Sequence, residues 1–192
     1  MRLFIAIELP GAVRLSAAAA AQRVRERVTR SAPRAVLRWV QPENLHITVW
    51  FLGEVREPRV AELAATLALP LDVTPFPMQL GGAGTFPERR APRALWLGVR
   101  DGREGVTAVH DALCARLMPL GFEPEERAYT PHLTIARVKE IAPPDAAAVR
   151  TALQDIDNVG DGFEIGAATL FRSRPGPAGA QYEPASHIRL SG

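Results

Sequence analysis

One short sequence pattern occurs twice in the chain: a histidine, an apolar residue, a threonine and a second apolar residue. The first motif is His-Ile-Thr-Val at residues 46–49, and the second is His-Leu-Thr-Ile at residues 132–135. Alternate residues of a β-strand point to the same face. Each motif would therefore present one imidazole and one hydroxyl on one face and bury its two apolar side chains on the other. Two such strands side by side would form a small polar cleft with pseudo-two-fold symmetry.

The side chains of the two motifs suit reactions at phosphorus. Histidine donates or accepts a proton near neutral pH, so His46 and His132 together could take a proton from water and give one to a leaving oxygen. The hydroxyls of Thr48 and Thr134 could donate hydrogen bonds to the non-bridging oxygens of a phosphate. We therefore expect a phosphodiester substrate, and a cyclic phosphate suits the site because ring strain helps the leaving group to depart.

Other interpretations of the motifs are weaker. Either motif alone is also typical of an ordinary half-buried strand with a polar outer face, and it is the pair that favours a site. Two histidines could ligate a metal ion, but two lone ligands make a poor site. The sequence has no cluster of Asp, Glu and His at metal-ligand spacing, no HExxH and no Gly-rich phosphate loop. We expect neither a metal nor a cofactor.

Composition narrows the class of protein. A length of 192 residues, with 47% hydrophobic and 23% charged residues, predicts one globular domain over residues 1–192. The net charge of +2 permits an anionic substrate without requiring one. Cys114 is the only cysteine, so no intrachain disulfide forms. The apolar run at the start is too short for a signal peptide and no segment suits a membrane span, so we expect a cytoplasmic protein.

Hydrophobic patterning divides the chain into two similar halves. It predicts strands at residues 3–9, 36–40, 45–53, 76–83, 94–100, 163–172 and 182–190, with a further strand at the second motif, and helices at 12–29, 58–69, 104–120 and 143–156. Gly121 would end the third helix and Asp145 would cap the fourth. Residues 174–179 are too rich in Pro and Gly for regular structure. The prediction is an α+β fold of two intertwined, pseudo-symmetric lobes of antiparallel sheet with outer helices and a cleft between them.

Several further stretches carry a resemblance to a known family. They are residues 2–7, 38–40, 42–48, 51–53, 81–87, 95–99, 120–122, 130–137 and 170–173. On these residues the sequence resembles the RNA 2′,3′-cyclic phosphodiesterases, first described as 2′-5′ RNA ligases, within the 2H phosphoesterase superfamily. The resemblance covers nearly the whole chain, and the paired motifs at this separation are highly specific.

The resemblance implies a reaction and roles for the motif residues. It implies hydrolysis of a 2′,3′-cyclic phosphate at an RNA end to a 2′-phosphate without a metal, and 2′-5′ ligation as the reverse-type activity. His46 would be the acid that protonates the leaving 3′ oxygen and His132 the base that activates water. The near-symmetry leaves the opposite assignment open. Thr48 and Thr134 would hold the phosphate.

Three more residues gain expected roles from the resemblance. Arg137 matches the arginine that often follows the second motif and would reach the phosphate. Strict alternation places it on the face opposite His132, so a bulge or a strand end must intervene. Tyr129 stands where the family often has an aromatic residue, which would stack on a base or pack at the rim. Trp50 stands where the family commonly has Lys, and alternation places it on the face of the first motif.

Other aromatic and basic residues are given structural roles. Trp39 and Trp96 are expected in the core, and His110 and His187 are expected to be structural or exposed. Arg89, Arg90 and Arg93 would follow RNA phosphates or, as the simpler interpretation, form a solvated loop.

Three functions remain in competition. The leading one is a metal-independent phosphodiesterase acting on RNA 2′,3′-cyclic phosphate ends. The second is a nucleotide- or RNA-binding module of the same fold without turnover. The third is the same chemistry on a small cyclic nucleotide such as ADP-ribose 1″,2″-cyclic phosphate. No heptads or long exposed apolar runs are present, so we expect a monomer without an obligate protein partner or a membrane association.

Overall fold

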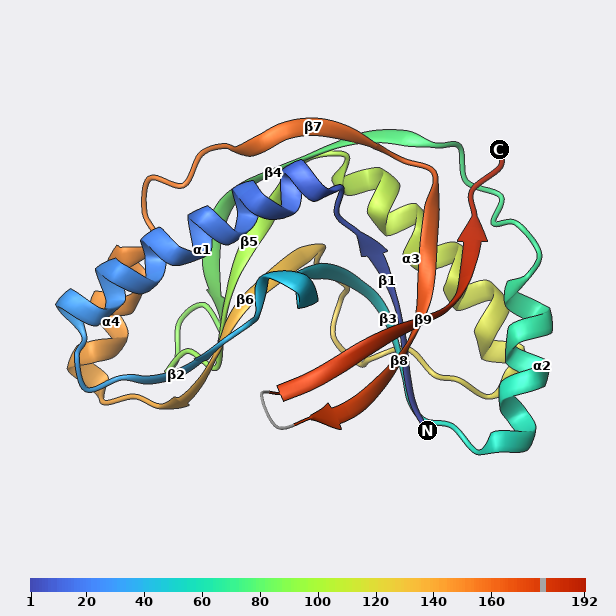
Figure 1. Ribbon diagram of the computed structural model, residues 1–192, viewed down its shortest axis with the longest axis horizontal. Helices are drawn as coiled ribbons and strands as arrows, with labels where there is room; N and C mark the ends of the chain where they lie inside the picture. The colour runs from blue at the N-terminus through green and yellow to red at the C-terminus, as the bar shows by residue number, and fades with distance from the viewer. Residues whose placement is uncertain (177–178) are drawn as a thin grey trace.

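The computed structural model describes residues 1–176 and 179–192 of the chain (Figure 1). Its strands and helices in chain order are β1 (Arg2–Glu8), α1 (Gly11–Ser31), β2 (Val36–Trp39), β3 (His46–Glu54), α2 (Glu57–Leu67), β4 (Phe76–Phe86), β5 (Ala94–Asp101), α3 (Arg103–Leu117), β6 (His132–Glu140), α4 (Pro143–Ala152), β7 (Val159–Ile165), β8 (Ala167–Gly176) and β9 (Gly179–Arg189). Short 3₁₀ turns span Pro42–Asn44 and Met118–Leu120. The predicted α+β class is confirmed.

One antiparallel sheet carries both motifs. Its strand order is β7-β4-β5-β6-β3-β1-β8-β9, and β2 pairs with β6 beside this path. The order is symmetric about its centre, where the motif strands β6 and β3 are neighbours. Ile47 of β3 pairs with Leu133 of β6, and both side chains are fully buried. This apolar pair, called the seam below, joins the two halves of the sheet on the face opposite the histidines and threonines of the motifs.

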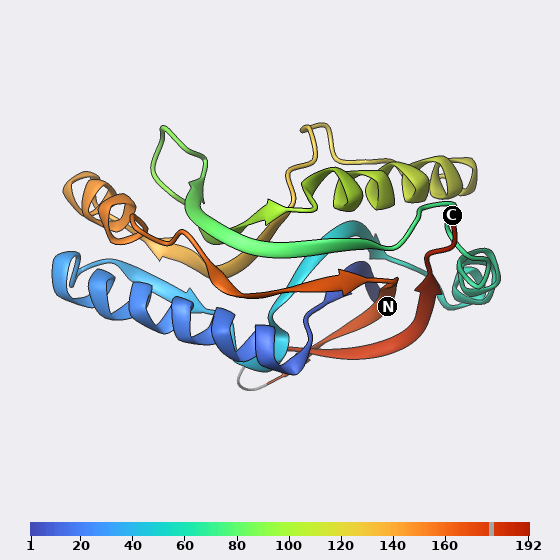
Figure 2. The same ribbon diagram turned by 90° about the horizontal axis from the view of Figure 1, so that it is seen from above.

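The helices interlock the two halves of the sheet. Helix α1 follows β1 but packs against α4 and β7, at the far end of the other half. Helix α3 follows β5 and packs across to β3. Figure 2 shows α1 and α3 on opposite sides of the molecule. Each buries a regular apolar stripe, Val13, Ala17, Ala20, Val24 and Val28 on α1 and Val106, Val109, Leu113 and Leu117 on α3. Each half therefore contributes a helix that packs on the other half.

Strand β3 contains a β-bulge directly after its threonine. Thr48 and Trp50 pair with consecutive residues of β1, so Val49 between them has no partner. An extra residue reverses the alternation of faces that follows it. Val49 and Trp50 are both buried, and Phe51 returns to the face of His46 with half of its surface exposed, 51%. The prediction that Trp50 shares the face of the first motif is wrong because of this bulge.

Strand β6 contains the equivalent bulge. Thr134 and Ala136 pair with consecutive residues of β5, and Ile135 between them has no partner on β5. Ile135 and Ala136 are both fully buried. Arg137 is thereby returned to the face of His132 and is exposed. The bulge that the sequence analysis required for Arg137 to reach the site is present.

The structure corrects three strand boundaries. Strand β4 runs to Phe86 rather than residue 83, because it pairs with β5 as far as Ala94. The segment predicted as one strand over 163–172 is two strands, β7 and β8, separated at Gly166, and these pair with β4 and β1 in opposite halves of the sheet. The prediction of irregular structure over 174–179 is wrong for the described residues, since β8 reaches Gly176 and β9 begins at Gly179. Residues 177 and 178 lie outside the described residues.

A proline within β8 explains why the hairpin was missed. Pro175 lies beyond Ser173, the last residue of β8 that pairs with β1. Proline is tolerated in a strand that pairs on one side only, because its missing backbone N–H can face the side that has no partner strand. Proline content alone therefore does not exclude a strand here.

Two helix ends were also predicted, one correctly. Gly121 adopts a left-handed conformation with φ 75° after the 3₁₀ turn that follows α3, as a helix stop commonly does. Asp145 does not cap α4. The N-cap is Ala142, and prolines 143 and 144 occupy the first turn, where a missing N–H is tolerated. Asp145 is instead buried and lies 3.5 Å from the guanidinium of Arg34.

The seam between the motif strands makes a testable contribution to stability. Leu133→Ala should lower the free energy of unfolding by about 2–5 kcal/mol, because it leaves a cavity in a fully buried site. Urea unfolding followed by circular dichroism measures this. The matched control is Leu15→Ala on α1, where the leucine is 72% exposed and the expected change is within about 0.5 kcal/mol. Equal effects of the two substitutions would show that the seam is not packed.

Candidate active site

Each motif histidine is the first residue of its strand and is held by the turn before it. The ring Nδ1 of His46 lies 2.7 Å from the backbone carbonyl oxygen of Asn44. The ring Nδ1 of His132 lies 2.7 Å from the carbonyl oxygen of Thr130. A carbonyl oxygen only accepts hydrogen bonds, so Nδ1 carries the proton in both rings. In the neutral form of each ring, Nε2 is therefore the basic nitrogen.

The threonine of the first motif forms a hydrogen bond with the histidine of the same motif. Thr48 Oγ1 lies 3.0 Å from His46 Nε2 and, in the tautomer just described, donates its hydroxyl proton to that nitrogen. Asn44, whose carbonyl holds the other side of the ring, also donates from its side-chain Nδ2 to the carbonyl oxygen of Ala180 on β9, at 2.9 Å. The first imidazole is thus tied to the β8–β9 hairpin as well as to its own strand.

Aromatic rings fix the planes of both imidazoles. The ring centroid of His46 lies 4.9 Å from that of Phe4 and 5.2 Å from that of Tyr182, which meets it edge-on. The ring of His132 meets Phe86 edge-on at 4.9 Å. Apolar neighbours of this kind exclude water and leave each ring few orientations.

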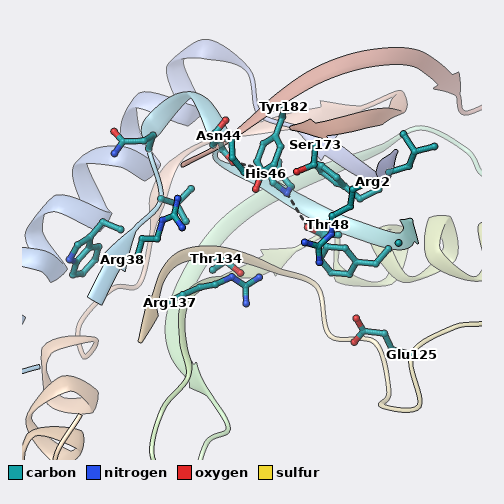
Figure 3. A pocket seen from close by; sticks show the side chains of 18 of the residues that line it. Arg2, Arg38, Asn44, His46, Thr48, Glu125, Thr134, Arg137, Ser173 and Tyr182 are labelled. Carbon is teal, nitrogen blue, oxygen red and sulfur yellow. Dashed lines mark hydrogen bonds between the residues drawn. The ribbon is translucent and has the colours of Figure 1, made fainter. Parts of the chain in front are cut away.

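The first motif faces a cleft of about 610 Å³ that also includes Thr134 and Arg137 (Figure 3). The residues that line this cleft are Arg2, Leu3, Phe4, Arg38, Trp39, Val40, Gln41, Asn44, His46, Thr48, Phe51, Gly53, Glu125, Thr134, Arg137, Lys139, Ser173, Ala180 and Tyr182. Among them are His46 and Thr48 of the first motif and Thr134 of the second, while His132 and Tyr129 are not among the lining residues.

Burial and charge set the protonation of the two imidazoles. Burial lowers the pKa of His46 from 6.5 to about 4; the Asn44 carbonyl opposes this, and the positive charges of Arg137 and His132 add to it. Burial also lowers the pKa of His132, opposed by the Thr130 carbonyl, with Arg137 lowering it and Glu125 raising it. The lowered pKa values favour neutral imidazoles at pH 7 when no anion is bound.

The remaining aromatic candidates lie beside or beneath the cleft. The hydroxyl of Tyr129 donates to the carbonyl oxygen of Thr48 at 2.9 Å, and its ring stacks on His110 with the planes 3° apart. Burial raises the pKa of the Tyr129 phenol. Trp50 also packs on His110, with ring centroids 5.3 Å apart. Tyr129 therefore contacts the first motif strand through its backbone, and its role in binding substrate stays a prediction.

Other sequence candidates are placed as follows. Trp39 is half-buried, packs against the hydrophobic core as expected and also lines the cleft. Trp96 is also only half-buried. Arg89, Arg90 and Arg93 are exposed in the β4–β5 loop and are not among the cleft residues.

Within residues 1–176 and 179–192, no group of three or more His, Cys, Asp or Glu side chains could hold a metal ion. No helix in these ranges is long and apolar enough to cross a membrane.

The fold and the paired motifs together define the class of the 2H phosphoesterases. Within it, the chain belongs to the 2′-5′ RNA ligase superfamily, whose family model matches residues 13–176. The likeness spans both motifs and the helices that interlock the two halves.

Curated relatives and solved structures agree with this membership. A protein of Methanocaldococcus jannaschii named RNA 2′,3′-cyclic phosphodiesterase is 33% identical over 184 residues, covering 95% of this chain and 97% of that protein. A protein of the same name from Archaeoglobus fulgidus is 34% identical over 152 residues, covering 78% of this chain and 80% of that one. The crystal structure of TT0787 of Thermus thermophilus matches with a TM-score of 0.76 and 28% identity, covering 99% and 98% of the two chains. E. coli LigT in its apo form matches with a TM-score of 0.72 and 25% identity over 100% and 98%.

Sequence reasoning missed several cleft residues. Asn44 was interpreted only as part of a turn, although its place two residues before His46 is the signal that a carbonyl would meet the ring. Glu125 was interpreted only as part of a loop. Arg38 and Tyr182 had no motif of their own, since they reach the site through strand pairing that the sequence does not display.

The effect of Arg137 on both imidazoles can be measured directly. Arg137→Ala should raise the pKa of both His46 and His132, because removing a positive charge favours the protonated ring. Imidazole nitrogen and proton shifts in an NMR pH titration report each value. Arg89→Ala, in the exposed loop, should leave both unchanged. Unaltered histidine pKa values in Arg137→Ala would place this guanidinium away from the rings.

Proposed function

We propose that the protein hydrolyses a 2′,3′-cyclic phosphate at the end of an RNA strand to a 2′-phosphate, without a metal. The observation that carries the proposal is the placement of two imidazoles, each with Nδ1 on a carbonyl and Nε2 as the basic nitrogen, at the first residue of two neighbouring strands. The curated relatives named RNA 2′,3′-cyclic phosphodiesterase support the choice of substrate.

Binding of the substrate would let one histidine take up from solvent the proton that the reaction needs. Both imidazoles are neutral in the free protein, and a phosphate anion beside them raises their pKa values because it stabilises the imidazolium. The guanidinium of Arg137 and the hydroxyls of Thr48 and Thr134 would donate to the non-bridging oxygens as charge develops there. The bound state would then hold one protonated and one neutral histidine, which is what the reaction needs.

We assign His46 as the acid and His132 as the base. In the reaction, neutral His132 takes a proton from water, the water oxygen attacks phosphorus, and the bond from phosphorus to the 3′ oxygen breaks as His46 Nε2 protonates that oxygen. The assignment follows the resemblance, and it requires the bound phosphate to raise the pKa of His46 from about 4 so that the ring holds the proton it donates. Glu125 raises the pKa of His132 and so strengthens it as a proton acceptor. With the 5′ hydroxyl of a second RNA strand attacking in place of water, the same groups would serve 2′-5′ ligation.

The primary test is hydrolysis of an RNA oligomer with a 2′,3′-cyclic phosphate end in the presence of EDTA. Wild type should turn over to a 2′-phosphate, and His46→Ala and His132→Ala should each lose about 10²–10⁴-fold in kcat, the range of acid–base catalysis. The control is His187→Ala on β9, a histidine whose side chain is 67% exposed, which should retain activity.

Two results would overturn the proposal. RNA binding without turnover, unaffected by either motif substitution, would make the protein a binding module. Loss of turnover in EDTA would mean that the reaction depends on a metal.

The acid and base roles can be separated with an activated substrate. A cyclic phosphorothiolate with sulfur in place of the 3′ oxygen has a leaving group that needs little proton donation. It should restore much of the activity of His46→Ala and little of that of His132→Ala. The reverse pattern in single-turnover measurements would exchange the two roles.

A further inference from the structure

The cleft continues beyond the groups that the proposed reaction uses. Its lining residues include a run of four at positions 38–41, from the end of β2 and the segment after it. Neither motif contributes to this part of the cleft. It lies on the side of Arg137 that faces away from Glu125, as Figure 3 shows.

Two arginines stand side by side across the strands that border this part of the cleft. Arg38 of β2 pairs in register with Arg137 of β6. Both are exposed and both line the cleft. Like charges directly opposite each other on paired strands are destabilising, so this pair favours an anion between or beside the two guanidinium groups.

A third cation extends the row. Lys139 lies two residues beyond Arg137 on β6, is exposed and lines the cleft. It is the single lysine in a chain with 23 basic residues. Within the described parts of the chain, no acidic side chain lies within 4.0 Å of the charged groups of Arg38, Arg137 or Lys139. The three charges are therefore available to an outside ligand.

The chemistry of this row indicates its ligand. Cations placed in a row along neighbouring strands match a chain of phosphates, and Trp39, half-buried against the core, lines the same part of the cleft. Single-stranded nucleic acids bind to grooves that combine positive charge with aromatic rings. A mononucleotide held at the histidines would leave Arg38 and Lys139 unused.

We propose that Arg38 and Lys139 bind the phosphates of the nucleotides that precede the reacting end, so that the protein selects an RNA strand over a cyclic mononucleotide. This inference rests on the proposed function for the identity of the reacting end. Arg137 links the two parts of the cleft, since it lines the cleft with His46 and lies opposite Arg38.

The test compares an RNA of about six nucleotides that ends in a 2′-phosphate with 2′-AMP. Fluorescence anisotropy, direct for the labelled oligomer and by competition for 2′-AMP, gives both affinities between about 50 and 200 mM salt. Arg38→Ala and Lys139→Ala should each weaken oligomer binding about three- to tenfold and reduce the slope of log K against log salt by about 0.7, the value for one contact to a single-strand phosphate. Binding of 2′-AMP should change far less. Arg89→Ala, an exposed arginine outside the cleft, is the matched control.

The outcomes separate this inference from the proposed function. Turnover of 2′,3′-cyclic AMP and of the cyclic-ended oligomer by wild type tests the reaction. The slopes of log K against log salt test the row of cations and do not require turnover. Equal slopes for Arg38→Ala, Lys139→Ala and Arg89→Ala would contradict the inference that Arg38 and Lys139 bind RNA phosphates. Equal losses for the oligomer and 2′-AMP would also overturn it, because they would place both side chains at the terminal phosphate.

Discussion

The pairing of Ile47 with Leu133 is the constraint on which the site depends. The two motif strands are neighbours in the sheet through this one buried pair. Neighbouring residues of a strand point to opposite faces of the sheet. Because Ile47 and Leu133 point into the core, the histidine before each of them and the threonine after it point to the other face. The separation and facing of the imidazoles therefore follow from an apolar contact that takes no part in the chemistry.

The two bulges make different use of the same backbone geometry. After each threonine, the extra residue returns to the cleft face the side chain that lies five positions beyond the histidine. In β3 this residue is Phe51 and in β6 it is Arg137. Thr48 bonds to His46, while Glu125 acts on the second ring. The two histidines of a symmetric scaffold therefore have different surroundings, because a few side chains near them are unequal.

The fold class, the two motif strands and the four helices could be predicted from the sequence, because period-two and helical apolar patterns are local signals. Six site residues were also predicted, of which His46, Thr48, Thr134 and Arg137 line one cleft. The first bulge, which placed Trp50 in the core, could not be predicted, since a bulge arises from pairing with another strand. Arg38 and Tyr182 were missed for the same reason: each reaches the cleft through strand pairing between distant segments. Pro175 led to the wrong prediction of irregular structure, because whether a strand tolerates proline depends on which strands pair with it at that position.

The exchange of helices between the halves has a consequence for how the chain folds. The seam joins residues 47 and 133, and the hydrogen bond from Thr169 to Glu8 joins residues 161 positions apart. Such non-local pairings require long stretches of chain to be ordered before the stabilising contacts form. Folding is therefore slow compared with that of proteins rich in local contacts. Neither half has a complete apolar cover of its own, since α1 and α3 each cross over. The two motif histidines would thus come together only when these long-range pairings form.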